Sequence, residues 1–377
     1  MWNGNLIIDA VAHAYDFVDS NRLERCSPEE YAALIKFVYD LGHGPLESRE
    51  PGYLLNDVEW SAGWTPQELA SVYFEESDVD IMVYHGVEIA AYFKRGSSPW
   101  QIGVELKKLY PDRVLLYAPV DPLKGLGELE TMERLVEEAP VNGFKFYPSN
   151  GIIDYDRNRA MTVMYDDPEK AFPFFEKGRD LGVNVMAIHK AWPVGPGPLD
   201  KDKIDDVNSA AVAFPDLTFE VVHSGWAFLE DCGIQLMTHP NIWANLEAVA
   251  NFAVRQPRRF AHVIGTLMRY GGDDRIMWGT GCPLGHPQPM VEAFANFQMP
   301  EDLQEGYGYA PLTDETKAKI FGGNMARLHN LDVEGIKSSI TGDEWTARRE
   351  SYSASPTGPW RELRERVEVG GMSAFMP

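Results

Sequence analysis

Short apolar runs alternate with amphipathic stretches along most of the chain. The runs are rich in Val, Ile, Leu and Phe, and most stretches between them place apolar residues at helical spacing. The apolar runs are residues 6–11, 79–84, 114–119, 143–147, 183–188, 218–222, 242–246 and 276–279. The helical stretches include residues 28–41, 66–76, 100–109, 126–138, 168–181 and 202–213. Eight strands that alternate with helices are typical of βαβ units and predict an α/β fold, a closed (β/α)8 TIM barrel.

Two segments exceed the minimal repeat of one strand and one helix. About seventy residues separate the first two apolar runs, and residues 42–65 among them contain several Gly and Pro residues. We expect this insertion to act as a lid or binding loop, because long loops inside compact domains are usually functional. Residues 332–377 follow the last predicted barrel helix, so we predict one barrel domain over residues 1–331 and a C-terminal extension beyond it.

The C-terminal extension carries aromatic residues among many charges, namely Trp345, Tyr352, Trp360 and Phe375. Aromatic residues in a polar setting suit docking on another protein surface. We therefore predict a homodimer, with packing of the extension on its own barrel as the alternative.

Composition and charge argue against several classes of partner. The chain has 34 Lys and Arg against 57 Asp and Glu, a net charge of −23, which repels nucleic acid and anionic lipid. Its apolar runs are far shorter than the ~20 residues of a membrane span. Cys26, Cys232 and Cys282 form no Cys-x-x-Cys pair, and so few cysteines indicate a reducing compartment. We expect a cytoplasmic protein that acts on a small molecule.

Polar residues follow or end most of the apolar runs. In a (β/α)8 barrel the active site lies at the carboxyl ends of the strands, so these residues are predicted to converge. Three imidazoles at separate strand ends could hold a metal ion or combine metal binding with acid/base work. The residues are His13, His85, Lys145, Tyr147, His189, His223, Glu247 and the pair Gly281-Cys282.

Several of these strand ends resemble motifs of the amidohydrolase superfamily. The matching segments are IIDAVAH ending at His13, GFKFYP at Pro148, VMAIH at His189, FEVVHSG at Gly225, IMWGTGCP at Pro283 and IFGGNMARL at Leu328. Together they cover residues 5 to about 331. The chain is similar to the amidohydrolase-2 group, which includes aminocarboxymuconate-semialdehyde decarboxylase and resorcylate-type decarboxylases.

The resemblance implies a metal site with two departures from the usual pattern. In that family the strand-one pair, the strand-five histidine and the strand-eight Asp bind the metal. Here His13 and His189 match ligands, whereas Val11 and Gly281 stand where two others belong. We expect one divalent metal ion, zinc by preference. Its third ligand is predicted among His223, Glu247, Cys282 and His286.

The resemblance also implies catalytic roles. His223 matches the acid/base residue, and Glu247 is the nearest substitute for the missing strand-eight Asp. Lys145 is expected to bind a substrate anion, with a Schiff base or a carbamylated lysine as alternatives. The substrate-binding residues are predicted to be Tyr147, Trp192, Trp226, His85 and His286, beside a Pro-rich loop at residues 193–198.

These expectations define a main hypothesis and three alternatives. The main one is a metal-dependent enzyme that hydrolyses a C–N or C–O bond in a small carboxylated or cyclic substrate. The alternatives are a nonoxidative decarboxylase of the same family, a metal-independent lactonase that uses His223 and Glu247, and a barrel that has lost catalysis. The two missing ligands are the argument for the last alternative.

Overall fold

Eight parallel strands form the centre of the molecule, as the periodicity predicts. The computed structural model describes residues 1–43, 50–149, 153–154, 159–192 and 199–370. The strands are β1 (Ile8–Ala12), β2 (Ile81–His85), β3 (Val114–Val120), β4 (Gly143–Phe146), β7 (Val185–His189), β8 (Thr218–Val222), β9 (Ile242–Asn245) and β10 (Ile276–Met277). Each strand pairs in parallel with the next in this order. A small antiparallel pair, β5 (Ile153–Asp154) and β6 (Arg159–Ala160), lies outside this sheet.

The sheet closes on itself through the last strand and the first. The Ala10 amide donates to the Trp278 carbonyl at 2.8 Å, and the Gly281 amide donates to the Val11 carbonyl at 3.1 Å. The His13 amide reaches the Cys282 carbonyl at 2.9 Å. These bonds satisfy the edges of β1 and β10, so the prediction of a (β/α)8 TIM barrel is confirmed.

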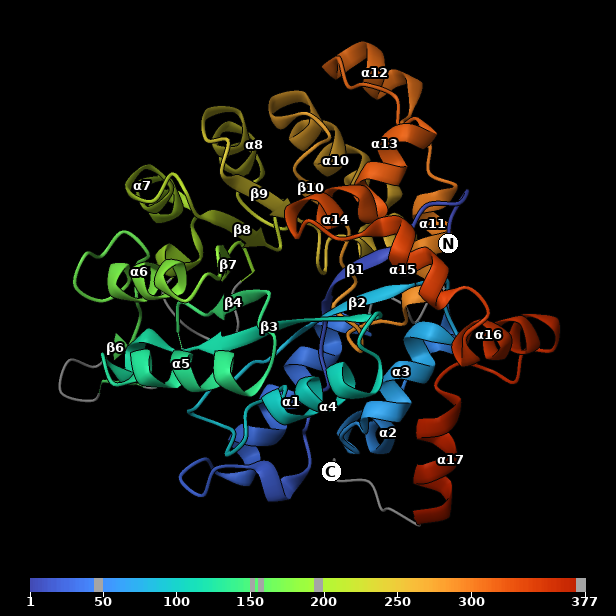
Figure 1. The fold of residues 1–377 in the computed structure, drawn as a ribbon, viewed down its shortest axis with the longest axis horizontal. Helices are drawn as coiled ribbons and strands as arrows, with labels where there is room; N and C mark the ends of the chain where they lie inside the picture. Colours follow the sequence, from blue (N-terminus) through green and yellow to red (C-terminus); the bar gives the residue numbers. More distant parts are fainter. Residues whose placement is uncertain (44–49, 150–152, 155–158, 193–198, 371–377) are drawn as a thin grey trace.

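Helices surround the barrel (Figure 1). Two of them begin where the sequence predicts, because Ser27 before Pro28 and Thr65 before Pro66 each form a capping box with a glutamate. The barrel helices are α1 (Pro28–Gly42), α2 (Asp57–Ser61), α3 (Pro66–Phe74), α4 (Trp100–Leu109), α5 (Glu128–Glu138), α6 (Phe172–Asp180), α7 (Asp205–Ala213), α8 (Leu229–Thr238), α9 (Asn251–Arg255), α10 (Pro257–Gly271), α11 (Pro287–Ala295), α12 (Glu301–Tyr307), α13 (Asp314–Ala318) and α14 (Asn324–Leu328).

The C-terminal extension packs on its own barrel. Its helices are α15 (Val333–Ile340), α16 (Glu344–Ala354) and α17 (Arg361–Gly370), and Figure 1 shows the last two beside α2 and α3. Trp360 is fully buried, and the Trp345 ring lies 5.9 Å from that of Phe74. Arg113 binds Asp343 at 2.7 Å. These contacts match the alternative that we gave, packing of the extension on its own barrel. Phe375 lies outside the described residues, and the homodimer stays a prediction.

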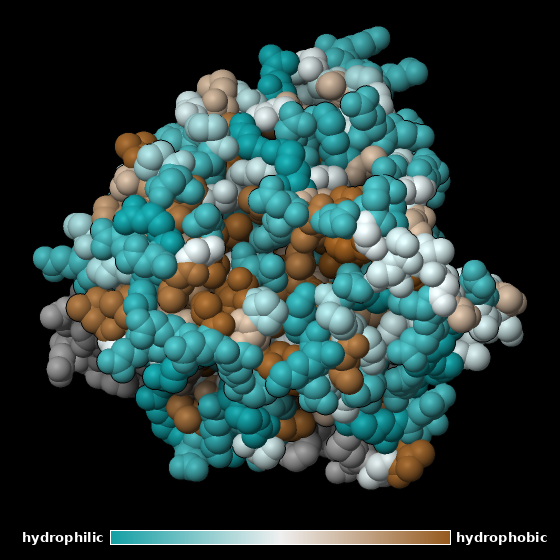
Figure 2. Space-filling view, in the orientation of Figure 1, coloured by the Kyte–Doolittle hydropathy of each residue, from teal (hydrophilic) through white to brown (hydrophobic). Residues whose placement is uncertain are grey.

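The predicted insertion over residues 42–65 contributes to the core in its described part. Trp60 is fully buried, with its ring 5.2 Å from that of Phe17. Residues 44–49 lie outside the described residues. The described helices include none long and apolar enough to cross a membrane. The face seen in Figure 2 is largely hydrophilic with scattered apolar patches, as the excess of acidic residues leads us to expect.

Candidate active site

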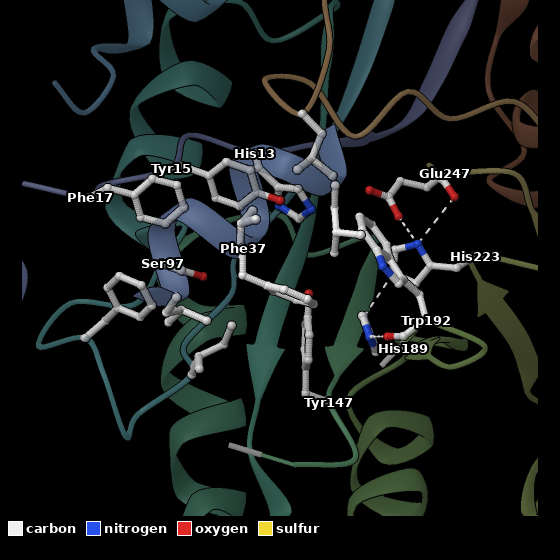
Figure 3. A pocket seen from close by; sticks show the side chains of 16 residues that line it. His13, Tyr15, Phe17, Phe37, Ser97, Tyr147, His189, Trp192, His223 and Glu247 are labelled. Atoms are coloured by element: carbon white, nitrogen blue, oxygen red, sulfur yellow. Dashed lines mark hydrogen bonds and ion pairs between the residues drawn. The ribbon is translucent and has the colours of Figure 1, made fainter. Parts of the chain in front are cut away.

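A pocket opens at the carboxyl ends of the strands, where the barrel predicts it. Polar side chains gather at one end of this pocket, and mostly apolar side chains line the rest of it (Figure 3). The polar end consists of His13, Tyr147, His189, His223 and Glu247. The walls and mouth consist of Tyr15, Phe17, Leu34, Phe37, Val38, Leu41, Ile89, Phe93, Ser97, Trp192 and Leu284. The pocket therefore suits a flat or apolar ligand that carries one reactive polar group.

Three side chains contact one another in a row at the polar end. His189 ends β7, and its Nε2 lies 2.7 Å from the Trp192 carbonyl oxygen. Its Nδ1 lies 3.0 Å from Nε2 of His223. Nδ1 of His223 in turn contacts the carboxyl group of Glu247. Figure 3 shows these contacts as dashed lines.

The geometry of this row sets the number of protons it holds. A carbonyl oxygen only accepts, so Nε2 of His189 carries a hydrogen. A neutral His189 then accepts at Nδ1, and His223 donates from Nε2. Nδ1 of His223 lies between the Glu247 carboxyl group and the Glu247 carbonyl oxygen, the latter 3.3 Å away. A neutral His223 that donates from Nε2 accepts from a protonated Glu247 carboxyl group, whereas a charged His223 donates from Nδ1 to the carboxylate or to that carbonyl oxygen. The three groups, which we call the relay, therefore share one mobile proton, an arrangement that suits general acid/base chemistry.

Burial favours the neutral form of the relay. All three side chains are at least 96% buried. Loss of water raises the pKa of the Glu247 carboxyl to about 7, although the charge of Lys145, and of His13 when it is protonated, opposes this. Burial, with the charge of Lys145, lowers the pKa of His223 well below its usual range. Burial therefore favours a proton on Glu247 over a proton on His223.

The backbone of this region is strained. His223, directly after β8, has a φ of 69°, and Ala248, beside Glu247, has a φ of 61°. Left-handed conformations at non-glycine residues cost about 1–3 kcal/mol and collect at functional sites. The fold thus holds His223, and the residue that follows Glu247, in conformations that residues with a side chain disfavour.

Glu247 occupies the space of the missing strand-eight side chain. A Cβ atom added to Gly281 would lie 2.1 Å from Oε1 of Glu247. Any side chain at position 281 would therefore displace the Glu247 carboxyl group. The acidic group that the family carries after strand eight is supplied here from the end of β9.

Lys145 and His13 surround the relay with further buried groups. Lys145 on β4 is 2% exposed, and its Nζ lies 5.2 Å from the centre of the Tyr147 ring. Burial lowers the pKa of Lys145 to about 8, so it remains mainly a cation at neutral pH. Nδ1 of His13 lies 3.2 Å from the His85 carbonyl oxygen. Burial lowers the pKa of His13 to about 4, which makes it neutral.

The donors at these strand ends do not fit the predicted metal ion. His189 and His223 have both ring nitrogens in contacts with protein atoms. Val11 belongs to the apolar cluster of the barrel interior, and Gly281 has no side chain. Across the residues that the structure describes, no three His, Cys, Asp or Glu side chains form a group that could hold a metal ion. A metal at His13 and His189 would require the relay to come apart.

The structure brings together most of the predicted site residues. His13, Tyr147, His189, Trp192, His223 and Glu247 line the pocket, and Lys145 lies beneath Tyr147. Trp226 stands behind the pocket, 5.9 Å from the Trp192 ring. His85 is fully buried against Tyr117, with ring centres 4.5 Å apart.

Two predicted residues lie elsewhere. The His286 side chain caps α11 and contacts Glu76 at 3.2 Å, away from the pocket. Cys282 packs with the outer core between strands and helices rather than with the barrel interior, as the alternation of strand residues predicts. Neither is part of the site that we propose. The Pro-rich loop 193–198 lies outside the described residues.

Sequence reasoning missed the mouth of the pocket. Helix α1 supplies Leu34, Phe37, Val38 and Leu41, although we assigned the role of lid to residues 42–65. These four residues share one face of α1 at spacings of three and four, which is the signal that could have identified them. Asp9 was missed as well. It accepts from the Thr280 amide at 2.9 Å and so ties β1 to the turn that contains Gly281.

Fold and pocket together define a (β/α)8 barrel protein with a buried cluster of Glu247, His223 and His189 at the carboxyl ends of its strands. A family model described as Amidohydrolase (Amidohydro_2) matches residues 66–331. The chain therefore belongs to the amidohydrolase family, which confirms the resemblance seen in its motifs. No curated protein matches the sequence at a significant level.

Solved structures of similar fold include mainly decarboxylases. An uncharacterized TIM-barrel protein from Bordetella bronchiseptica is 16% identical, with a TM-score of 0.54, 85% of this chain and 97% of the other being covered. A 5-carboxyvanillate decarboxylase from Sphingomonas paucimobilis is 17% identical, with a TM-score of 0.52 and coverages of 87% and 100%. Another from Novosphingobium aromaticivorans, with bound manganese, is 14% identical, with a TM-score of 0.53 and coverages of 87% and 98%. At these identities the likeness shows the fold alone.

Proposed function

We propose that this amidohydrolase removes the carboxylate group of a small aromatic acid without an oxidant. The observation that carries the proposal is the relay of Glu247, His223 and His189, which shares one proton at the polar end of a pocket walled by aromatic rings. Structural neighbours that are decarboxylases of 5-carboxyvanillate and 2,6-dihydroxybenzoate support this over our first hypothesis of hydrolysis.

The relay supplies the proton that this reaction consumes. Loss of CO2 from an aromatic carboxylate requires one proton at the ring carbon that bears the carboxylate. In the proposed step the contact between His223 and His189 opens, His223 gives its Nε2 proton to that carbon, and its Nδ1 recovers one from Glu247. The carbon–carbon bond then breaks, its electron pair returns to the ring, and CO2 leaves. The products are the arene and CO2, and the relay needs one new proton for each turnover.

The walls of the pocket favour the same step. Phe17, Phe37 and Phe93 surround the mouth with apolar surface. Such surroundings solvate a carboxylate poorly and neutral CO2 well, so transfer of the substrate from water favours loss of the charge. Lys145, as a buried cation beneath the Tyr147 ring, draws the acid into the pocket.

Isotope incorporation tests the proposal. We expect the protein, incubated in D2O with a panel of hydroxylated benzoic acids, to release CO2 and to place one deuterium at the former carboxylate position. Mass spectrometry of the arene measures both the yield and the label. A protein that releases no CO2 from any member of the panel would contradict the assignment.

Hydrolysis of a cyclic ester is the second candidate. The observation that favours it is the contact of Glu247 with His223, since the charged form of this pair could take a proton from an attacking water molecule. A probable 2-pyrone-4,6-dicarboxylic acid hydrolase from Acinetobacter baumannii is among the neighbours, at 12% identity and a TM-score of 0.50. If the protein opens pyrone lactones and leaves aromatic acids intact, hydrolysis is its reaction and decarboxylation is not.

We derive no metal-dependent step for this chain. Some neighbours were crystallised with manganese, and we first expected zinc at His13 and His189. The engaged nitrogens of His189 and the apolar Val11 argue against such a site. We expect kcat to be unchanged after dialysis against a strong chelator. We also expect added Mn²⁺ to keep the electron paramagnetic resonance signal of the free ion. Tight binding of one Mn²⁺ per chain would refute this expectation.

A further inference from the structure

A second set of polar side chains is buried inside the barrel and does not line the pocket. Tyr117 on β3, Glu220 on β8 and Asn245 on β9 are each fully buried, beside Lys145 on β4. The interiors of such barrels are usually filled by branched apolar side chains. Burial of a carboxyl group among them is costly unless it is hydrogen-bonded. A buried polar set is unusual at this place in a barrel, which indicates a role beyond packing.

Hydrogen bonds connect this set to the opposite end of the barrel. The Tyr117 hydroxyl donates to Oε2 of Glu220 at 2.9 Å, and Asn245 donates to Oε1. Nε2 of His329 lies 2.8 Å from the Tyr117 oxygen. His329 follows α14 and is partly exposed, whereas Glu220 has no exposed surface. A continuous path of hydrogen bonds thus runs from near the surface into the barrel.

The path begins at the amino-terminal ends of the strands. Met325 and Ala326 of α14 pack in one apolar cluster with Leu6, which precedes β1. Helix α14 therefore closes the end of the barrel opposite the pocket. Space for the Tyr117 ring exists because residue 143 is glycine, since a Cβ atom there would lie 2.8 Å from that ring.

The inner end of the path reaches the level of Lys145. Lys145 pairs in register with Ala187, and Ala187 pairs with Glu220, so Lys145 and Glu220 flank the small side chain of Ala187. Burial lowers the pKa of Lys145 to about 8, and the charges of Glu247 and Glu220 oppose this shift. Burial likewise raises the pKa of Glu220 to about 7. The charge of each group is therefore sensitive to pH near neutrality, and each charge acts on the other.

We propose that His329, Tyr117 and Glu220 conduct protons from near the surface to the level of Lys145 beneath the active site. A protonated His329 passes its Nε2 proton to the Tyr117 oxygen while the Tyr117 hydroxyl proton moves to Glu220. Burial lowers the pKa of His329 to about 4, so its charged form is a transient carrier. One proton enters at His329 and is held on the Glu220 carboxyl group, whose charge acts on Lys145 across Ala187. This rests on the proposed function, in which the cation of Lys145 draws the acid into the pocket.

A Tyr117→Phe variant tests the path without turnover. The protonated Glu220 carboxyl group has an infrared band near the ester region, which Glu220→Gln identifies by its loss. After a rapid drop in pH, we expect this band to appear about tenfold or more slowly in Tyr117→Phe and in His329→Ala. We also expect small imidazoles to restore the rate in His329→Ala, with efficiency that follows their pKa. If His329 has only a structural role, the restored rate will not depend on the pKa of the added imidazole.

The matched control is Tyr84→Phe, which removes another fully buried hydroxyl, one that donates to the Pro99 carbonyl at 2.7 Å in the outer core. We expect the Glu220 band to form at the wild-type rate in this variant. An unchanged rate in Tyr117→Phe would overturn the path even if the protein decarboxylates aromatic acids. Slowed protonation in a protein that releases no CO2 would instead keep the path and refute the proposed reaction.

Discussion

Replacement of Glu247 by Gln is expected to lower kcat for decarboxylation by a factor of about 10²–10⁴, because general acid/base groups contribute that much. Gln keeps the size of the side chain and can still bond to His223, but it cannot hold the mobile proton. Steady-state kinetics on the best substrate of the panel measure the effect. A variant with wild-type kcat would remove Glu247 from the relay.

The same substitution should change how stability depends on pH. Burial raises the pKa of Glu247 to about 7, from 4.5 as its ordinary value, so the folded state binds this proton more tightly than the unfolded state. The stability from this proton is fully present below about pH 4.5 and is lost as pH rises through about 7. Relative to the wild type, Glu247→Gln should therefore gain thermal stability between pH 5 and pH 8.

Glu59→Gln is the matched control for both measurements. Glu59 is also buried, but it caps α2 and binds Arg364, far from the relay. Its kcat should match the wild type, and its stability difference from the wild type should not follow the Glu247 profile. Equal pH profiles for the two variants would show that Glu247 is charged in the folded protein.

Gly281→Ala should abolish most activity through one added methyl group. The new Cβ would meet Oε1 of Glu247 at 2.1 Å, so the carboxyl group must leave its contact with His223. Gly281 also has a φ of 70°, which costs about 1–3 kcal/mol for a residue with a side chain. We expect kcat to fall by a factor of about 10² or more, as for loss of the acid itself.

Gly182→Ala separates the clash from the backbone strain. Gly182 has a φ of 76°, close to that of Gly281, and no heavy atom lies within 4 Å of its added Cβ. Both variants should lose a similar amount of thermal stability from strain, measured by calorimetry, but only Gly281→Ala should lose activity. Similar kcat values for the two variants would mean that Glu247 does not need its present position.

The predictions for Glu247→Gln and Gly281→Ala both concern one departure from the expected family pattern, the position of an acidic side chain. The expected acidic group is absent after the eighth strand, and a carboxyl group from the seventh strand end fills the space. There it contacts a histidine, and that histidine contacts another that the family pattern assigns to the metal. In the function that we propose, this site transfers a proton and binds no metal ion.

Most of the fold could be predicted because each βα unit is local. The eight strands differ from the predicted runs by only a few residues at their ends, and α1 and α3 begin at the predicted prolines. Periods of two and 3.6 residues are set by the backbone and appear in any window of the sequence. Strands that are parallel must also present their carboxyl ends on one side, which is why His13, His189 and His223 could be placed together.

The arrangement within the site could not be predicted in this way. The sequence shows Gly281 and Glu247 as separate residues 34 positions apart, and nothing local indicates that one makes room for the other. Nothing local in the sequence indicates that α1 lies over the pocket or that Tyr117 bonds to Glu220. Which side chains meet depends on strand register, barrel closure and rotamers, all of them set by packing between distant segments.

The sequence by itself determined the barrel, the family and the set of strand-end histidines, because these follow from local periodicity and from motifs. Only the tertiary structure decided that Glu247 replaces the missing acid and that the two histidines use their nitrogens on each other. The physical reason is that a hydrogen bond requires atoms about 3 Å apart with a donor facing an acceptor. Distances of that precision arise only when the closed barrel fixes all eight strand ends at once.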